Sequence, residues 1–320
     1  MSNWNFYLSL RRMLFLARHS KLDLYTVEGE SAGSSLTMLV ADDGSTLPYI
    51  SSVVFPSGAV INKKGSIYAL KAHWLIDRKV DLVVVGANYL LLRNYARMGF
   101  HLIPKWINPY LALTDHPDVL INKLDKSPKR DITRNLKKAE ASGFNYEVTT
   151  EPAWFDKFYN DMYVPYAQKR YGKLAQIDGY ERVKQAYTKG AGIIVKQYEK
   201  HVGGTIVYTQ ENVMRNPYVG ISGGDEIVAR EGASRVLYYY VMLLAHSWGC
   251  EGINFGSTRP FLSDGVLKYK LKWGMQLRHD ELSTAVFALA APGLTKPAQN
   301  FLETNPFFQI TKHGFEIFRP

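Results

Sequence analysis

The stretch from Gly192 to His279 decides the fold. It reads, in order, GIIVKQY (192–198), GGTIVYT (203–209), YVGISGG (218–224), ASRVLYYYVMLLAHSWG (233–249), GINFG (252–256), SDGVLKYKLKW (263–273) and MQLRH (275–279). Short runs rich in β-branched residues between glycine-containing turns predict strands, whereas the long run at 233–249 and the short one at 263–273 predict helices. Strands alternating with helices predict a mixed sheet flanked by helices, which is an α/β (α+β) fold.

The chain upstream of this stretch also alternates strands and helices. Strands are predicted at LYTV (24–27), SLTMLVA (35–41), YISSVVF (49–55) and DLVVVG (81–86), and helices at about 66–79 and 89–97. A further strand is predicted around 146–149, followed by aromatic-rich helical sequence at 152–172. The N-terminal part of the chain therefore also predicts an α/β layer.

A strongly basic helix is predicted from Ser127 to Gly143. Ser127 is suited to the cap, Pro128 to the first helical position and Gly143 to the end. One side is apolar through Ile132, Leu136 and Ala139, and the remaining surface is basic through Lys126, Lys129, Arg130, Arg134, Lys137 and Lys138. This surface is either an ordinary solvated helix face or a face that binds an anionic ligand.

The composition narrows the classes of protein. At 320 residues the chain is long enough for two domains, and its net charge of +10 indicates an anionic partner. A single cysteine, Cys250, excludes a disulfide framework, and we predict that it is a small buried residue. We expect no membrane span, no secretory signal and no metal site, and therefore a cytoplasmic location.

The strand and helix order of 192–279 resembles the acetyl-CoA-binding core of the GNAT superfamily. In that family the fourth and fifth strands separate, and the pyrophosphate of the donor lies at the N-terminus of the helix between them, where backbone N–H groups are unpaired. The resemblance places the donor at the helix start formed by Arg230, Gly232, Ala233, Ser234 and Arg235. It places backbone donors for an oxyanion at the end of the fourth strand, at Gly220, Ser222 and Gly223.

The sequence EGINFGSTRPFLSDGVLKYKLKWG (251–274) resembles the closing motif of Fem-type aminoacyl transferases, and NPYLALTDHPDVLINKLDKSPKRDITRNLKKAEASG (108–143) resembles the segment that opens their transferase domain. The resemblance implies that Lys270 stabilises the oxyanion, although it is also consistent with a surface lysine. Arg259 is suited to binding a carboxylate or phosphate. Asp264 is expected either to orient Arg259, to accept a proton or to cap a helix, and Tyr269 either to return a proton or to pack.

The resemblance also implies tandem GNAT-like domains. We expect a degenerate GNAT-like domain at residues 1–115 and the acyltransferase domain at residues 116–320. The expected activity is transfer of an acetyl or aminoacyl group from acyl-CoA to an amine or hydroxyl of a small-molecule or peptide acceptor. The alternatives are a Fem-like transferase that uses aminoacyl-tRNA and acts on a cell-wall peptide precursor, and a non-catalytic nucleic-acid-binding protein.

Overall fold

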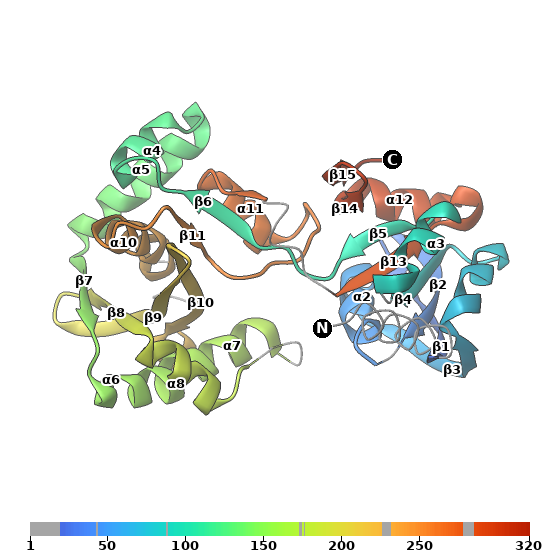
Figure 1. The fold of residues 1–320 in the computed structure, drawn as a ribbon, viewed down its shortest axis with the longest axis horizontal. Helices are drawn as coiled ribbons and strands as arrows, with labels where there is room; N and C mark the ends of the chain where they lie inside the picture. Colours follow the sequence, from blue (N-terminus) through green and yellow to red (C-terminus); the bar gives the residue numbers. More distant parts are fainter. Residues whose placement is uncertain are drawn as a thin grey trace, which may run out of the picture. The chain divides into compact units, whose positions relative to one another are not determined.

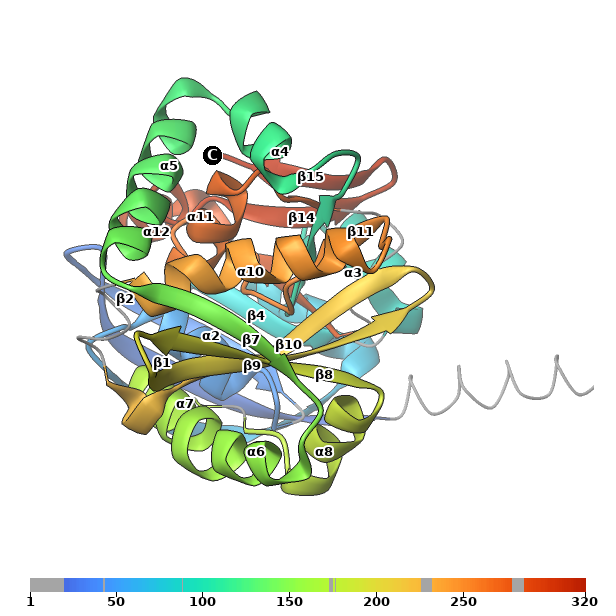
Figure 2. The same cartoon turned by 90° about the vertical axis from the view of Figure 1, so that its left-hand side faces the viewer.

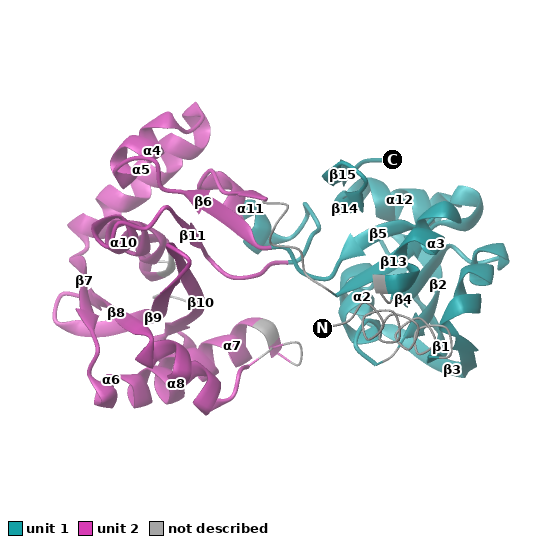
Figure 3. Ribbon diagram, viewed as in Figure 1, with its two compact units in different colours: residues 1–107, 259–268, 279–320 teal, residues 108–258, 269–278 magenta. Residues whose placement is uncertain are grey.

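The chain folds into two compact units. The computed structural model describes residues 20–42, 44–87, 89–172, 175, 177–225, 232–277 and 285–320. Unit 1 comprises residues 1–107, 259–268 and 279–320, and unit 2 comprises residues 108–258 and 269–278 (Figure 3). Each unit is built around a mixed β-sheet with helices packed on both faces (Figure 1), which confirms the predicted fold class.

The main sheet of unit 1 packs against a hydrophobic core on each face, except at one exposed edge strand. Its strands, in spatial order, are β3 (Ala59–Tyr68), β1 (Lys21–Ser31), β2 (Ser34–Asp42), β4 (Leu82–Ala87), β13 (Val286–Ala290) and β5 (His101–Pro104). Met38 and Val40 of β2 contribute to the core on one face, together with residues of α2 (Leu47–Val54) and α12 (Lys296–Thr304). Leu39 and Ala41 face the other side, together with residues of the 3₁₀ helix η1 (Ala69–Asp77) and α3 (Leu92–Arg97). The alternation follows from the two-residue period of a strand.

Two predicted elements of unit 1 are wrong. The segment predicted as a strand at 49–55 forms helix α2. The buried Asp42 carboxylate accepts hydrogen bonds from the backbone N–H groups of Thr46 (2.8 Å) and Leu47 (2.7 Å), and Pro48 occupies the first turn. Capping of the first turn and burial of one helix face outweigh the strand preference of β-branched residues. The helix predicted at 66–79 is limited to η1, because residues 66–68 continue β3.

The C-terminal segment belongs to unit 1. Strand β13 lies between β4 and β5 and pairs antiparallel with both. It is followed by α12 and by the hairpin β14 (Phe307–Thr311) and β15 (Gly314–Phe318). The expected boundary between residues 115 and 116 therefore differs from the observed division, since residues 259–268 and 279–320 group with the N-terminal unit.

The sheet of unit 2 has the strands that the sequence predicts. In spatial order these are β12 (Gln276–Leu277), β6 (Pro109–Ala112), β11 (Gly252–Asn254), β10 (Val213–Ile221), β9 (Lys200–Gln210), β8 (Gly190–Gln197) and β7 (Phe144–Thr149). Strands β7 to β10 form an antiparallel series, whereas β10 and β11 are parallel and joined through α10 (Ser234–Ser247). The predicted order of strands and helices is confirmed here.

Helices cover both faces of this sheet (Figure 2). On one face lie α10, α4 (Pro117–Lys123) and α5 (Lys126–Ala141), and on the other lie α6 (Pro152–Lys157), the π-helix η3 (Phe158–Tyr163), α7 (Val164–Tyr171) and α8 (Tyr180–Thr188). Ile132 and Ala139 of α5 are buried as predicted, but the helix begins one residue before Ser127, and Asp125 occupies the N-cap position without a hydrogen bond from its side chain to the first turn. Within the described ranges, none of the helices combines the length and the apolar character needed to cross a bilayer.

Candidate functional site

The parallel strands β10 and β11 pair over only a short distance. Their ladder joins Val213–Arg215 to Gly252–Asn254, where β11 ends, whereas β10 continues to Ile221. On its other side β10 stays paired with β9 as far as Ile221, with a register shift between Arg215 and Tyr218. The carboxyl-terminal part of β10 therefore extends beyond the strand beside it, as the resemblance implied for the fourth and fifth strands.

Asn216 occupies the irregular position of β10. Its buried side-chain amide donates to the Thr205 hydroxyl and to the carbonyl oxygen of Ile206 on β9. The next residue, Pro217, has no N–H to donate to a ladder. The Asn216 amide thus holds the bulge to β9 at the point where pairing with β11 ends.

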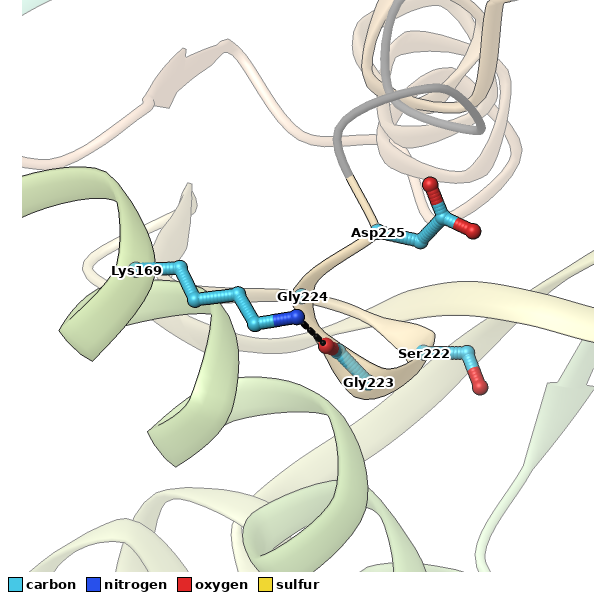
Figure 4. Close-up of a pocket in the computed structure, with 5 residues that line it drawn as sticks. All are labelled: Lys169, Ser222, Gly223, Gly224 and Asp225. Atoms are coloured by element: carbon cyan, nitrogen blue, oxygen red, sulfur yellow. Dashed lines mark hydrogen bonds between the residues drawn. The ribbon is translucent and has the colours of Figure 1, made fainter.

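A pocket of about 520 Å³ lies at the end of β10 (Figure 4). Its lining consists of Lys169, Ser222, Gly223, Gly224 and Asp225. Lys169 reaches across from α7, and its ammonium donates to the carbonyl oxygen of Gly223 at 2.8 Å. Two of the predicted residues, Ser222 and Gly223, therefore line a pocket of the size that small-molecule sites occupy.

Close packing shapes the backbone at this pocket. Gly223 and Gly224 have φ angles of +57° and +61°, a conformation that side chains rarely adopt. A Cβ at Gly224 would lie 2.9 Å from the Pro165 carbonyl oxygen and 2.9 Å from Lys169 Cδ. The predicted residue Gly220 is buried, and a Cβ there would lie 2.7 Å from the backbone of Met162 and Tyr163. These glycines let η3 and α7 approach the end of β10.

The predicted donor site at the start of α10 is partly described. Gly232 is buried with φ +149°, and its α-carbon faces Ala139 of α5 and Phe144 of β7, while Ala233 is fully buried. Arg235 donates to the Asn135 side-chain oxygen at 3.1 Å, which joins the start of α10 to the basic helix α5. Arg230 and the side chain of Ser234 lie outside the described residues.

Lys270 is buried and has backbone partners. Its side chain is 2% exposed, and its ammonium donates to the carbonyl oxygens of Gly256 (2.5 Å) and Ser257 (3.4 Å). The lysine therefore links α11 (Gly265–Lys272) to the loop that follows β11. These contacts direct the ammonium, which the resemblance assigned to oxyanion stabilisation, toward backbone carbonyl oxygens.

Tyr269 lies in an aromatic cluster of unit 2. Tyr238 of α10 stacks on Phe255 at 4.4 Å and meets Tyr269 edge-on at 5.0 Å, and Trp273 lies 6.3 Å from Tyr269. Burial raises the pKa of Tyr269 to about 12, and the Trp273 indole and the charge of Arg235 partly oppose that rise. Tyr269 is therefore protonated at neutral pH, as a proton donor must be.

The other two predicted catalytic residues belong to unit 1. The Arg259 guanidinium lies 5.3 Å from the ring centroid of Tyr49 and donates to the Ser52 hydroxyl at 3.3 Å, so both contacts are to α2. Asp264 accepts a hydrogen bond from the Leu267 backbone N–H at 2.9 Å, which is the geometry of a helix cap. The four residues predicted to be catalytic are thus divided between the units, with Tyr269 and Lys270 in unit 2.

Three residues of the pocket were not predicted from the sequence: Lys169, Gly224 and Asp225. The glycine-rich end of the strand was visible in the sequence, but Lys169 lies in a different helix, and its position depends on tertiary packing. Cys250 is buried as predicted, and burial raises the pKa of its thiol. In the described part of the chain, no three His, Cys, Asp or Glu side chains are grouped as metal ligands would be.

Comparison with known proteins finds similarity in structure. No family model and no curated protein matches the sequence. Among solved structures, the chain resembles FemX with a TM-score of 0.43 at 12% identity, covering 82% of this chain and 83% of that one. It resembles L-PGS from Bacillus licheniformis with a TM-score of 0.40 at 10% identity, covering 95% and 96%. A tandem GNAT protein from the clavulanic acid biosynthesis pathway gives 0.32 at 12% identity, covering 85% of each chain.

Proposed function

We propose that this chain is an acyltransferase that moves an acyl group from an activated donor, foremost an acyl-CoA, to an amine or hydroxyl acceptor. The observation that carries the proposal is the end of β10, which continues beyond its ladder with β11 and leads into the pocket at Ser222–Asp225. In open α/β sheets, ligands bind outside the carboxyl ends of strands, where the connections change direction. The pocket has this position in the sheet of unit 2.

The chemistry suits the groups at the pocket. The acceptor nitrogen or oxygen attacks the thioester carbonyl, and the carbonyl oxygen becomes an anion in the tetrahedral intermediate. The intermediate then expels the CoA thiolate, and the proton lost by the acceptor is transferred to the thiolate, directly or through the solvent. Backbone N–H groups of the Ser222–Gly224 turn and a nearby positive charge supply the stabilisation that such an anion needs.

The donor's phosphates have a basic surface available in unit 2. Lys126, Arg130, Lys137 and Lys138 are exposed on α5, which packs against α10 beside the Arg235–Asn135 hydrogen bond. Among the described ion pairs of this helix, Arg134 meets Asp131 at 2.9 Å. We assign the donor phosphates to the surface where α5 and the start of α10 meet.

A thermal-shift experiment tests the proposal. Several CoA thioesters and desulfo-CoA are added to the full chain. Pantetheine thioesters, which carry no phosphate, serve as the control. Binding at 100 times Kd stabilises the folded chain by about 2.7 kcal/mol, so the melting temperature rises measurably. Transfer to a panel of amines is then measured through the free thiol that the reaction releases. Absence of both the shift and the thiol release with every donor contradicts the proposal.

The exposed basic face of α5 supports one alternative donor, an aminoacyl-tRNA. A protein that neutralises several RNA phosphates loses affinity steeply as salt rises, because bound counterions are released. Titration with tRNA over a range of salt concentrations measures that slope. Tight, salt-dependent tRNA binding with aminoacyl transfer favours the Fem-like donor, whereas RNA binding without any transfer favours a non-catalytic nucleic-acid-binding protein.

A further inference from the structure

One lysine contacts the loop after β11 and another contacts the turn after β10, and the structure gives them different surroundings. Lys270 is buried, with its ammonium on the carbonyl oxygens of Gly256 and Ser257. Lys169 is exposed at the end of α7 and lines the pocket beyond β10. Its ammonium donates to the Gly223 carbonyl oxygen at 2.8 Å (Figure 4).

We propose that Lys169, in place of Lys270, is the lysine that stabilises the oxyanion of the transfer reaction, and that it does so while holding the Ser222–Gly224 turn. This inference rests on the proposed function and names a further residue for it. A lysine ammonium has three donors, so the bond to Gly223 leaves two N–H groups for a ligand in the pocket.

The turn has a conformation that needs support from outside. Gly223 and Gly224 are both in the left-handed region, with φ of +57° and +61°, and glycine populates many other conformations when it is unrestrained. The Asp225 N–H closes the turn on the Ser222 carbonyl oxygen at 3.1 Å. The Lys169 ammonium fixes the Gly223 carbonyl from the opposite element, and the contacts of Gly224 with α7 limit its movement. Lys169 therefore holds the Gly223 carbonyl, and with it the turn, before the substrate binds.

The charge of Lys169 also acts on the reaction itself. The ammonium attracts an oxyanion that develops in the pocket, whose lining also includes Asp225. The ground-state carbonyl is neutral and gains less from the same charge. The effect of Lys169 should therefore appear in kcat more than in KM.

The first test compares Lys169→Met and Lys169→Arg with the wild type, with Lys157→Met as a control at an exposed lysine of the same helical layer. Loss of one oxyanion donor lowers kcat about 10²- to 10³-fold. We expect a loss of that order in Lys169→Met with KM nearly unchanged, partial recovery in Lys169→Arg, and wild-type kinetics in Lys157→Met. Equal kcat in wild type and Lys169→Met overturns the inference while leaving the acyltransferase proposal intact.

The second test does not depend on turnover. In chain labelled with ¹⁵N-glycine, the amide resonances of Gly223 and Gly224 are followed during titration with sodium acetate, a small oxyanion. We expect both resonances to shift in the wild type and in Lys157→Met, and to stay unchanged in Lys169→Met. A wild-type turn that does not respond to acetate overturns the inference. A wild-type response combined with no transfer from any donor refutes the acyltransferase proposal and the catalytic role of Lys169 with it, and leaves only an anion site.

Discussion

The ammonium of Lys270 lies 2.5 Å from the carbonyl oxygen of Gly256, although the lysine side chain is almost completely buried. Gly256 lies two residues after the end of β11, where the ladder with β10 has ended. A Cβ on Gly256 would lie 3.6 Å from the Asn216 carbonyl oxygen on β10. Lys270 thus holds the chain after β11 in place beside the irregular part of β10.

Replacement of this lysine should affect stability first. In Lys270→Met the carbonyl oxygens of Gly256 and Ser257 lose a charged donor, and hydrogen bonds to charged groups contribute about 1.5–3 kcal/mol each. We expect urea unfolding to show a loss of that order, whereas the exposed neighbour Lys268→Met should unfold like the wild type. Wild-type stability of Lys270→Met together with lost activity would instead return Lys270 to the catalytic role.

Charge reversal on α5 should weaken donor binding. Lys137→Glu and Lys138→Glu place negative charge on the surface that we assign to the donor phosphates. We expect Kd for a CoA thioester to rise severalfold at low salt, and the difference to vanish near 1 M salt, where the Debye length is about 3 Å. The matched control is Lys189→Glu, an exposed lysine at the end of α8. An identical Kd in all four proteins at low salt places the phosphates elsewhere.

Gly220 should not tolerate a side chain. In Gly220→Ala the new methyl group would lie 2.7 Å from the backbone of Met162 and Tyr163, so the π-helix η3 or β10 must move. Overpacking of this kind costs about 1–3 kcal/mol, which thermal or urea unfolding detects. Gly265→Ala, where no atom lies within 4 Å of the new methyl group, is the control with unchanged or higher stability. Equal stability of the two variants would show that η3 packs less closely on β10 than described.

The stability of unit 2 should fall as the pH drops through the range of His201. Burial lowers the pKa of His201 below its usual 6.5, and the charges of Lys157 and Lys196 lower it further, against the opposing charge of Glu147. Below pH 6.5 the unfolded chain therefore binds a proton that the folded chain does not, and protonation favours unfolding. Above that pH the contribution of His201 is constant.

The variant His201→Gln isolates this effect. It should lose less stability than the wild type when the pH is lowered from 8 to about 5.5. Unfolding free energies measured by urea at several pH values provide the comparison. Parallel pH profiles for the two proteins would count against a lowered pKa of His201.

Much of unit 2 was predictable because its signals are local. The runs at 192–198 and 203–209 are short, rich in β-branched residues and bounded by glycine-containing turns. They form β8 and β9 as expected. The helix at 233–249 is long enough for its pattern to exclude a strand, and it appears as α10. By contrast, 49–55 is short and β-branched, and its helical state depends on the carboxylate of Asp42 and on packing against the sheet. Local preference could not reveal either.

The candidate site shows the same division. Ser222 and Gly223 were named from the sequence because the GNAT resemblance implies oxyanion donors at the end of the fourth strand, and both line the pocket. Lys169 is 54 positions away from Gly223 in the sequence. It is one of several polar residues in an aromatic-rich helix, and the sequence does not distinguish it from the others. The motif Tyr269-Lys270 was equally visible, but the sequence did not show that its lysine is buried on backbone carbonyls.

By itself the sequence determined the fold class, the order of elements in unit 2, the burial of Cys250 and the basic character of α5. These properties follow from the period of the hydrophobic residues, from the turn residues and from the charges along a continuous segment. Only the tertiary structure decided which lysine faces the pocket, that 49–55 is a helix, and that β13 completes the N-terminal sheet between β4 and β5. Each of these features depends on contacts between residues far apart in the chain. Such contacts form only when burial of the assembled core outweighs the local secondary-structure preference and the entropy cost of closing long loops.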